Sequence, residues 1–351
     1  MSGPFSSRLF SRRRSFLGGF VVGATAAGAS CLAALQLWDR RREEPEKSPL
    51  EEFGFPRAGA EVRRYLNHAL SYDQAKKTPR WVIEHLSKDK LDGIADRQHC
   101  KFKPDPNIPK IFSASNEDYY KSGWSRGHMA PAGDNKFSTE AMAETFYLSN
   151  IVPQNYENNA GFWNRLEMYC RDLTKKYDDV WVVSGPLVLP ETQEDGRKRV
   201  SYQVIGKDDV AVPSHLYKVI LARQQDSAEA LAVGAFVVPN IPIGFDRQLP
   251  EYQVQLEELE KMSGLIFFPG ADGFKDLCEE DGCRLIQLEE FKLYIAGRRM
   301  KNARNLQKVE KIMSELREAD IKPDDYLTSL YEQKRKELSV ETNDQQERRR
   351  G

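Results

Sequence analysis

The chain is 351 residues long and carries 52 Lys and Arg against 53 Asp and Glu, a formal net charge of −1. This length can build one large core or two modest domains with tails, and an apolar content of 40% is ordinary for a globular protein. The balanced charge excludes a positive field over the whole molecule, so any site for a polyanion must be local.

The N-terminal segment differs in composition from the rest, because residues 1–38 contain no Asp or Glu. Residues 1–15 combine arginines with serines, which is typical of a mitochondrial targeting leader. Residues 16–38 are uncharged and just reach the ~20 residues that span a bilayer, so we expect an inner-membrane anchor. A cleaved presequence or a secretory signal-anchor stays open, since arginines on both sides leave the orientation undecided. The charged, proline-containing residues 39–56 suit a linker.

Residues 57–285 are expected to form the main folded body. An apolar, β-branched run predicts a strand at 81–85. Further on, Trp124 and the tyrosines at 119–120 precede a cluster of polar residues. These aromatic rings could pack in the core or stack on unpaired bases, and stacking is worth roughly 1–3 kcal/mol per base.

The most informative stretch runs from Ser125 to Arg171. Hydrolysis of a phosphodiester needs a base for water, a hard cation on the phosphate oxygens, and positive charge for the transition state. His128 can serve as the base and Asn159 can offer a carbonyl oxygen to Mg²⁺. Arg126 and Arg171 can face the phosphate.

A helix is predicted from Asn159 onward. Asn159, Trp163, Glu167 and Arg171 recur every four residues, so a helix would align them in one stripe beside an apolar face. We expect Glu167 to hold metal-bound water and to orient Arg171, its i+4 neighbour. Trp163 borders the apolar face and is expected in the core.

The pattern after this helix indicates β-structure. Apolar runs predict strands at 180–184, 202–205, 217–222, 231–238 and 265–268. Ser184 is not interpreted as a nucleophile, because it lacks the Gly-x-Ser-x-Gly elbow. Of the five cysteines, Cys278 and Cys283 could form a bridge, but a coincidental pair is the expectation.

The chain changes character again after about Leu285, and residues 286–338 are expected to form a helical C-terminal part. Helices are predicted at 302–319 and 326–338, with Pro323 ending the first unit. A docking or dimer helix pair is the alternative interpretation. Residues 339–351 are expected to be a disordered tail, because they are too polar to fold.

Three separated motifs carry a resemblance to a known family. They are Arg126-Gly127-His128, the run from Leu148 to Gln154, and the run from Asn159 to Glu167. Together they resemble the sugar-nonspecific DNA/RNA nucleases of the ββα-metal (His-Me finger) fold, most of all the mitochondrial exo/endonuclease G branch. The similarity covers the chain from about Phe53 to the C-terminal helices, plus the N-terminal anchor. It implies an α+β fold with a mixed central β-structure and a C-terminal helical wing.

The resemblance also implies roles for single residues. The general base falls on His128, the protein's metal ligand on Asn159, and the carboxylate that holds metal-bound water on Glu167. The phosphate-facing arginines fall on Arg126, Arg171 and, less directly, Arg97, whose surroundings align poorly. Asn150 matches a family asparagine near the site, which would hold the loop or a water.

Two positions depart from the family pattern. Most members carry Asp where this chain has Ser125, although serine is typical of the exo/endonuclease G branch. Some bacterial relatives carry an asparagine near the metal where this chain has Phe146. The serine removes a carboxylate beside the active strand and so changes the local hydrogen bonds.

The expected function is a Mg²⁺-dependent (or Mn²⁺-dependent) nuclease with one ion per active site. Its expected preference is 5′–3′ exonuclease activity on single-stranded DNA with some endonuclease activity, in mitochondrial DNA processing or repair. The implied partners are nucleic acid, the inner membrane and a second copy in a homodimer. The alternatives are a DNA/RNA endonuclease like endonuclease G, and an inactive membrane-tethered nucleic-acid binder.

Overall fold

The computed structural model describes residues 60–224 and 231–350, with the backbone alone for residues 340–350. The predicted leader (1–15), membrane anchor (16–38) and linker (39–56) lie outside the described residues. Within the described ranges, none of the helices has the length and apolar character needed to cross a bilayer.

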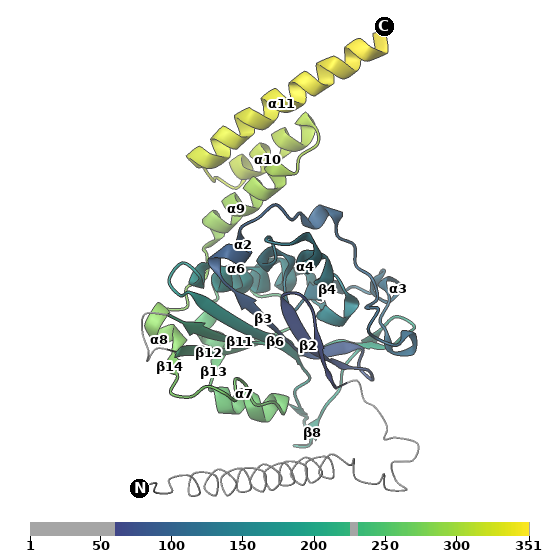
Figure 1. Cartoon of the computed structure of the whole chain (residues 1–351), viewed down its shortest axis with the longest axis vertical. Coiled ribbons are helices and arrows are strands. Elements are labelled where there is room, and N and C mark those ends of the chain that lie inside the picture. The colour runs from purple at the N-terminus through teal and green to yellow at the C-terminus, as the bar shows by residue number, and fades with distance from the viewer. Residues whose placement is uncertain (1–59, 225–230, 351) are drawn as a thin grey trace, which may run out of the picture. The chain divides into compact units, whose positions relative to one another are not determined.

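An eight-stranded sheet forms the centre of the fold (Figure 1). Its order is β1-β2-β3-β6-β11-β12-β13, with antiparallel neighbours, and β14 pairs in parallel with β12. The strands are β1 (Val62–Arg64), β2 (His68–Asp73), β3 (Thr78–Leu86), β6 (Asp179–Leu187), β11 (His215–Arg223), β12 (Leu231–Pro239), β13 (Gln253–Val254) and β14 (Lys275–Asp276). The predicted strands at 81–85, 180–184, 217–222 and 231–238 are confirmed, and so is the mixed α+β class.

Short two-stranded sheets accompany the central sheet. They are β4 (Ser125–His128) with β5 (Ile151–Gln154), β7 (Glu191–Thr192) with β8 (Lys198–Arg199), and β9 (Val204–Ile205) with β10 (Val210–Ala211). The helical segments of the body are α2 (Lys88–Leu91), η2 (Arg97–His99), η3 (Lys110–Phe112), α3 (Asn116–Tyr119), η4 (Ala132–Asp134), α4 (Thr139–Glu144), η5 (Leu148–Asn150), α5 (Tyr156–Asn158), η6 (Asn159–Trp163), α6 (Asn164–Leu173), η7 (Leu249–Tyr252), α7 (Leu256–Ser263) and α8 (Leu277–Asp281).

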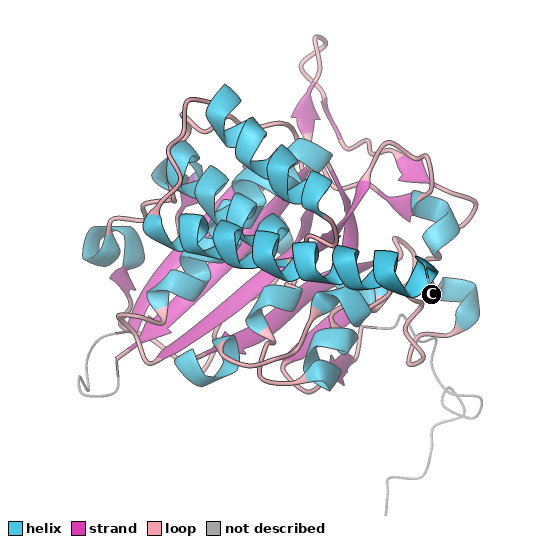
Figure 2. Cartoon of the chain, turned by 90° about the horizontal axis from the view of Figure 1, so that it is seen from above, coloured by secondary structure: helices cyan, strands magenta, loops and turns pink. Residues whose placement is uncertain are grey.

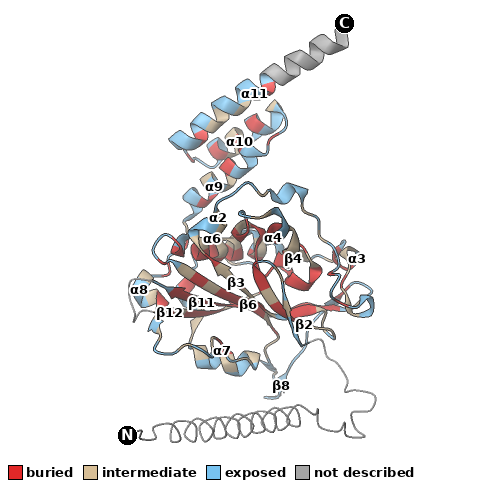
Figure 3. Ribbon diagram, in the orientation of Figure 1, coloured by how far each residue is buried: buried red, intermediate tan, exposed pale blue. Residues whose placement is uncertain are grey.

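Helices cover both faces of the sheet, which places most strand side chains in the interior (Figures 2 and 3). Val182 packs in the cluster that contains Leu166 of α6, whereas the next residue, Val183, packs in the cluster that contains Leu259 of α7. Successive strand residues point to opposite faces, so the apolar run serves both cores. The α6 side of the sheet is the one that positions the site.

The predicted strand at 265–268 is wrong. Helix α7 ends at Gly264 in the left-handed conformation, with φ of 69°, and Phe268 has φ of 49°. These turns prevent an extended ladder. Phe267 is still buried against the α7 side of the sheet, so this apolar run is a core-covering loop.

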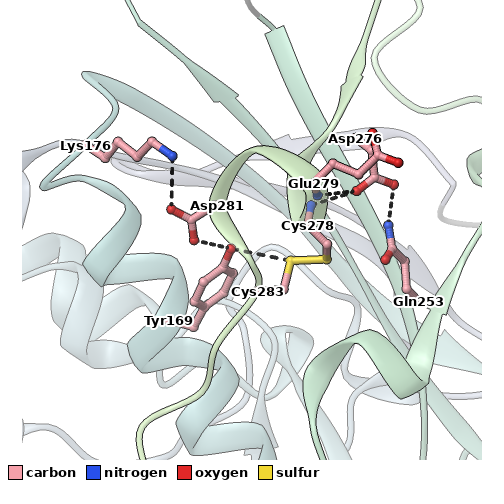
Figure 4. The surroundings of a disulfide bond; sticks show 8 residues. All are labelled: Tyr169, Lys176, Gln253, Asp276, Cys278, Glu279, Asp281 and Cys283. Atoms are coloured by element: carbon pink, nitrogen blue, oxygen red, sulfur yellow. Dashed lines mark hydrogen bonds and ion pairs between the residues drawn. A yellow bond between two sulfur atoms is a disulfide. The ribbon is translucent and has the colours of Figure 1, made fainter.

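The expectation that Cys278 and Cys283 do not pair is also wrong, because the two form a disulfide (Figure 4). Helix α8 closes at Gly282 in the left-handed conformation, and Cys283 follows with φ of 48°. This reversal brings the two Cα atoms to 4.8 Å. Sequence separation alone did not reveal the turn that makes the bridge possible.

The C-terminal wing is present and has its own apolar cluster. It consists of α9 (Leu288–Lys301), α10 (Leu306–Glu318) and α11 (Asp325–Arg350). The predicted start at residue 302 is wrong, since the Asn305 side chain caps α10 by accepting from the Lys308 amide. Helix α11 continues past Leu338 to Arg350. Residues 339–350 contain no Gly or Pro and are rich in Glu, Gln and Arg, which favours this continuation.

Candidate active site

A pocket of about 520 Å³ lies where the β4–β5 hairpin, the α6 region and the wing helix α9 meet. It receives six of the predicted site residues, namely Arg97, Arg126, His128, Asn159, Glu167 and Arg171. The hairpin pairs antiparallel, with His128 opposite Ile151. Gly127 is required there, because a Cβ at this position would lie 2.1 Å from Oε1 of Gln154.

His128 ends β4 with an exposed fraction of 9%. The rings of Phe102 and Phe146 lie 5.2 and 4.9 Å from its imidazole. Burial, with Arg97 nearby, lowers the pKa of His128 to about 3, so the ring is neutral at physiological pH. A phosphate in the pocket would act in the opposite direction, because negative charge favours the imidazolium.

Asn159 opens the π turn η6, and Ser125 fixes its amide. The Nδ2 group donates to Oγ of Ser125 at 3.2 Å, and that hydroxyl in turn donates to the carbonyl of Gln154 at 2.7 Å. Among the described residues no hydrogen bond reaches Oδ1 of Asn159. The serine that departs from the family pattern therefore orients the amide and leaves its oxygen available.

The stripe predicted from i+4 spacing is interrupted at Trp163, whose predicted place in the core is confirmed. Trp163 is completely buried under the helix, and Asn164 lines the pocket instead. Residues 159–163 form a π turn, in which the backbone hydrogen bonds span five residues and not the four of an α-helix. Asn159 is therefore followed on the pocket side by its i+5 neighbour, and the i+4 spacing resumes from Glu167 to Arg171.

Arg171 and Glu167 line the pocket, but the predicted pairing between them is not the hydrogen bond that forms. Nη1 of Arg171 donates to Oδ1 of Asp134 at 2.6 Å. Burial raises the pKa of Glu167 to about 7, although Arg171 acts against this shift. Sequence reasoning missed Asp134, because the only signal was an acidic residue in the loop after β4.

A second buried layer of charge lies beneath the pocket. Lys218 on β11 is 1% exposed and donates to Oγ of Ser184 at 2.7 Å. Burial, with Asp134 nearby, raises the pKa of Glu84 well above its usual range. Ser184 is 1% exposed and does not line the pocket, which agrees with its interpretation as a structural residue.

The two remaining arginines approach the pocket from different elements. Arg126 donates to Oδ1 of Asn116 at 2.6 Å and stacks 4.7 Å from the ring centre of Phe102. Arg97 begins η2 and lies 5.8 Å from the ring centre of Phe146. The ring of Phe146 therefore contacts both Arg97 and His128.

Asn150, expected to hold the loop or a water, and Trp124, expected in the core or stacked on a base, do not line the pocket. Asn150 is fully buried, and its side chain bonds the backbone of Ala130 in both directions and the carbonyl of Thr145. It holds the loop after His128 and has no surface to offer a substrate. Trp124 packs partly against an apolar cluster and donates to Gln203 at 3.2 Å.

Sequence reasoning also missed the contribution of the wing to the pocket. Helix α9 and the residue after it supply Tyr294, Arg298, Lys301 and Asn302. Asn302 accepts a hydrogen bond of 2.5 Å from Gln98, which joins the wing to the loop that carries Arg97. Nothing in the spacing of α9 indicated which of its faces would meet the body.

The donor set fits a hard divalent cation with few protein ligands. Over residues 60–224 and 231–350, no group of three His, Cys, Asp or Glu is placed to hold a metal. Among the oxygens that line the pocket, the amide oxygen of Asn159 and the carboxylate of Glu167 suit Mg²⁺ or Mn²⁺ with several waters.

A β-hairpin that carries a histidine, followed by a helix that carries an amide and a carboxylate into the same pocket, defines a ββα-metal nuclease. The chain belongs to the family of DNA/RNA non-specific endonucleases, whose profile matches residues 46–274. A second profile, the endo/exonuclease (EXOG) C-terminal domain, matches residues 286–334, which is the wing. The prediction of a nuclease with this fold is confirmed.

Relatives cover both parts of the chain. The chain is 69% identical to the mitochondrial nuclease EXOG of Xenopus laevis over the whole of both chains, and 61% identical to that of Homo sapiens over 95% of each. It is 36% identical to the mitochondrial endonuclease G of Homo sapiens, over 70% of this chain and 91% of that protein. Among solved structures, EndoG in its complex with EndoGI matches with a TM-score of 0.59 at 40% identity, over 65% of this chain and 95% of that one.

Proposed function

We propose that the chain hydrolyses phosphodiester bonds with one bound Mg²⁺ or Mn²⁺, using His128 as the general base. The neutral imidazole takes a proton from the attacking water. Asn159 would hold the ion directly, and Glu167 would hold waters of its shell. The observation that carries the proposal is the convergence of these three side chains on one pocket.

The arginines supply the positive charge that the reaction needs. Arg126, Arg171 and Arg97 face the same pocket, so they can neutralise charge that develops on the phosphate. A divalent ion, when bound, would stabilise the leaving 3′-oxygen as a Lewis acid. Near-native turnover of His128→Ala would show that His128 is not the general base.

We further propose a 5′–3′ exonuclease preference on single-stranded DNA, with some endonuclease activity. The wing supports this, because α9 forms one wall of the pocket and thereby restricts how far a strand can extend past it. The profile that matches the wing is described as the endo/exonuclease (EXOG) C-terminal domain, and the EXOG relatives of Xenopus laevis and Homo sapiens align over 100% and 95% of this chain, whereas the match to endonuclease G covers 70% of it. The competing function is internal cleavage of either nucleic acid, as the name endonuclease G describes for those relatives.

Digestion of 5′-labelled single-stranded and double-stranded DNA, with and without EDTA, tests these proposals together. Short labelled products that appear first, and only without EDTA, are expected. A random ladder would favour the endonuclease. Salt-sensitive binding without hydrolysis would establish the inactive binder.

We propose mitochondrial location, anchoring of residues 16–38 in the inner membrane, homodimerisation, and a role in DNA repair. The mitochondrial relatives and the acid-free leader support the compartment. Carbonate extraction of mitochondria tests the anchor, which predicts that the chain stays in the membrane pellet. Sedimentation of the purified chain tests the dimer.

A further inference from the structure

Two carboxylates compete for the guanidinium of Arg171. Glu167 precedes it by one helical turn on α6, the spacing at which Glu and Arg side chains ordinarily pair. Asp134 lies at the end of η4, across the pocket wall, and takes the hydrogen bond at 2.6 Å. Asp134, which is distant in the sequence, therefore accepts the hydrogen bond that the neighbouring Glu167 would ordinarily accept.

Asp134 is placed to hold Arg171 without touching a substrate. Its side chain is 1% exposed and does not line the pocket, whereas Arg171 and Glu167 both do. A buried, charge-assisted bond to a planar guanidinium is directional. The geometry leaves Glu167 without a hydrogen bond from Arg171.

The backbone of the same loop limits where the guanidinium can move. A Cβ added to Gly133 would lie 3.2 Å from Nη1 and 3.6 Å from Cζ of Arg171. A methyl group there would push the guanidinium by a few tenths of an ångström. Gly133 and Asp134 thus restrain Arg171 from two directions.

We propose that Asp134 is a positioning residue that directs Arg171 toward the substrate phosphate and keeps it away from Glu167. Without Asp134, Arg171 would turn to its i+4 neighbour, so one change would misplace the cation and occupy the carboxylate that holds water. The inference rests on the proposed function, in which Arg171 faces the phosphate and Glu167 serves the metal shell. Asp134 acts only through Arg171.

A double-mutant cycle separates this role from a merely structural one. We would measure kcat and KM on a single-stranded DNA substrate with Mg²⁺ for the wild type, Asp134→Ala, Arg171→Ala and the double variant, with the melting temperature of each. Asp134→Ala is expected to lower kcat by roughly 10–10²-fold with a smaller change in KM, below the 10²–10³-fold typical for loss of a transition-state donor. The double variant is expected to match Arg171→Ala alone.

Further variants control for folding and for charge. Asp134→Asn keeps an acceptor oxygen and is expected to retain more activity than Asp134→Ala. Gly133→Ala leaves every charge in place. It is expected to lower kcat in the wild-type background but to have no further effect in the Arg171→Ala variant. If Asp134→Ala does not fold, the double-mutant cycle of Gly133→Ala with Arg171→Ala takes its place as the test. Asp172→Asn, which removes an exposed acid paired with Lys175, should keep kcat unchanged.

The outcomes distinguish the inference from the function on which it rests. Effects of Asp134→Ala and Arg171→Ala that multiply would overturn the positioning role and leave the role of Arg171 intact. Wild-type kcat in folded Asp134→Ala would also overturn it. Wild-type kcat in Arg171→Ala would refute the proposed phosphate role of Arg171, and the positioning role with it.

Discussion

Replacement of Glu167 by glutamine should stabilise the folded chain above neutral pH while it weakens catalysis. Burial raises the pKa of this carboxyl from 4.5 to about 7, so the folded state prefers the protonated form. Below the unfolded pKa both states are protonated and the group costs nothing. As pH rises from the unfolded value to the folded value, the unfolded state ionises first, so the free energy of unfolding falls by up to roughly 3 kcal/mol at 1.36 kcal/mol per pKa unit.

The expected magnitude is smaller than this ceiling, because the pocket is open to solvent and water screens the charge. Urea denaturation at pH 5 and pH 8, without divalent cations, measures the difference between Glu167→Gln and the wild type. A gain of about 1–2 kcal/mol is expected at pH 8 and a much smaller one at pH 5. Both chains retain Glu84 and Asp134, so the difference between the two chains reduces the contribution of these two carboxyl groups.

Glu157→Gln is the matched control, because Glu157 is exposed on α5 near the start of the site helix. It should leave the free energy of unfolding unchanged at both pH values. A gain for Glu167→Gln that is absent at pH 8, or equal at the two pH values, would refute the reasoning. The result would then mean that water reaches the carboxylate freely in the folded state.

His128→Ala should lower kcat by roughly 10²–10⁴-fold with an unchanged melting temperature, and retained turnover on labelled DNA would contradict the base assignment. Ser125→Ala releases the Asn159 amide, so half-maximal activity should require more Mg²⁺; an unchanged Mg²⁺ titration would show that the hydroxyl does not orient the ligand. Cys278→Ser opens a short loop and should cost roughly 2 kcal/mol of unfolding free energy in non-reducing urea titrations. The same loss should follow dithiothreitol treatment of the wild type, and equal stability of both forms would argue that the bridge constrains nothing.

The sequence was sufficient to predict the parts of the site that depend on local chemistry. The Arg-Gly-His strand, the amide at 159 and the carboxylate at 167 are close in sequence to the elements that present them. Apolar runs likewise predicted the long central strands, because a strand covered on both faces is apolar throughout.

The missed features depend on backbone geometry or on distant contacts. The π turn brings Asn164 to the pocket, and no residue type in the sequence indicates a π turn. Asp134 displaces Glu167 as the partner of Arg171 only because the loop after β4 returns to α6. The face that α9 turns toward the pocket depends on how two separate apolar clusters dock, which periodicity within one helix does not specify.

The link between body and wing has a consequence for protein engineering. The buried Arg165 of α6 donates to the carbonyl of Ile286, and Tyr169 of the same helix donates to Asp281 beside the disulfide. A chimera joined at the family boundary near residue 286 that shifts the backbone there would leave a buried guanidinium without its carbonyl acceptor, at a cost of about 1–3 kcal/mol. Wing exchange between related nucleases should therefore transplant residues 277–287 together with the helices.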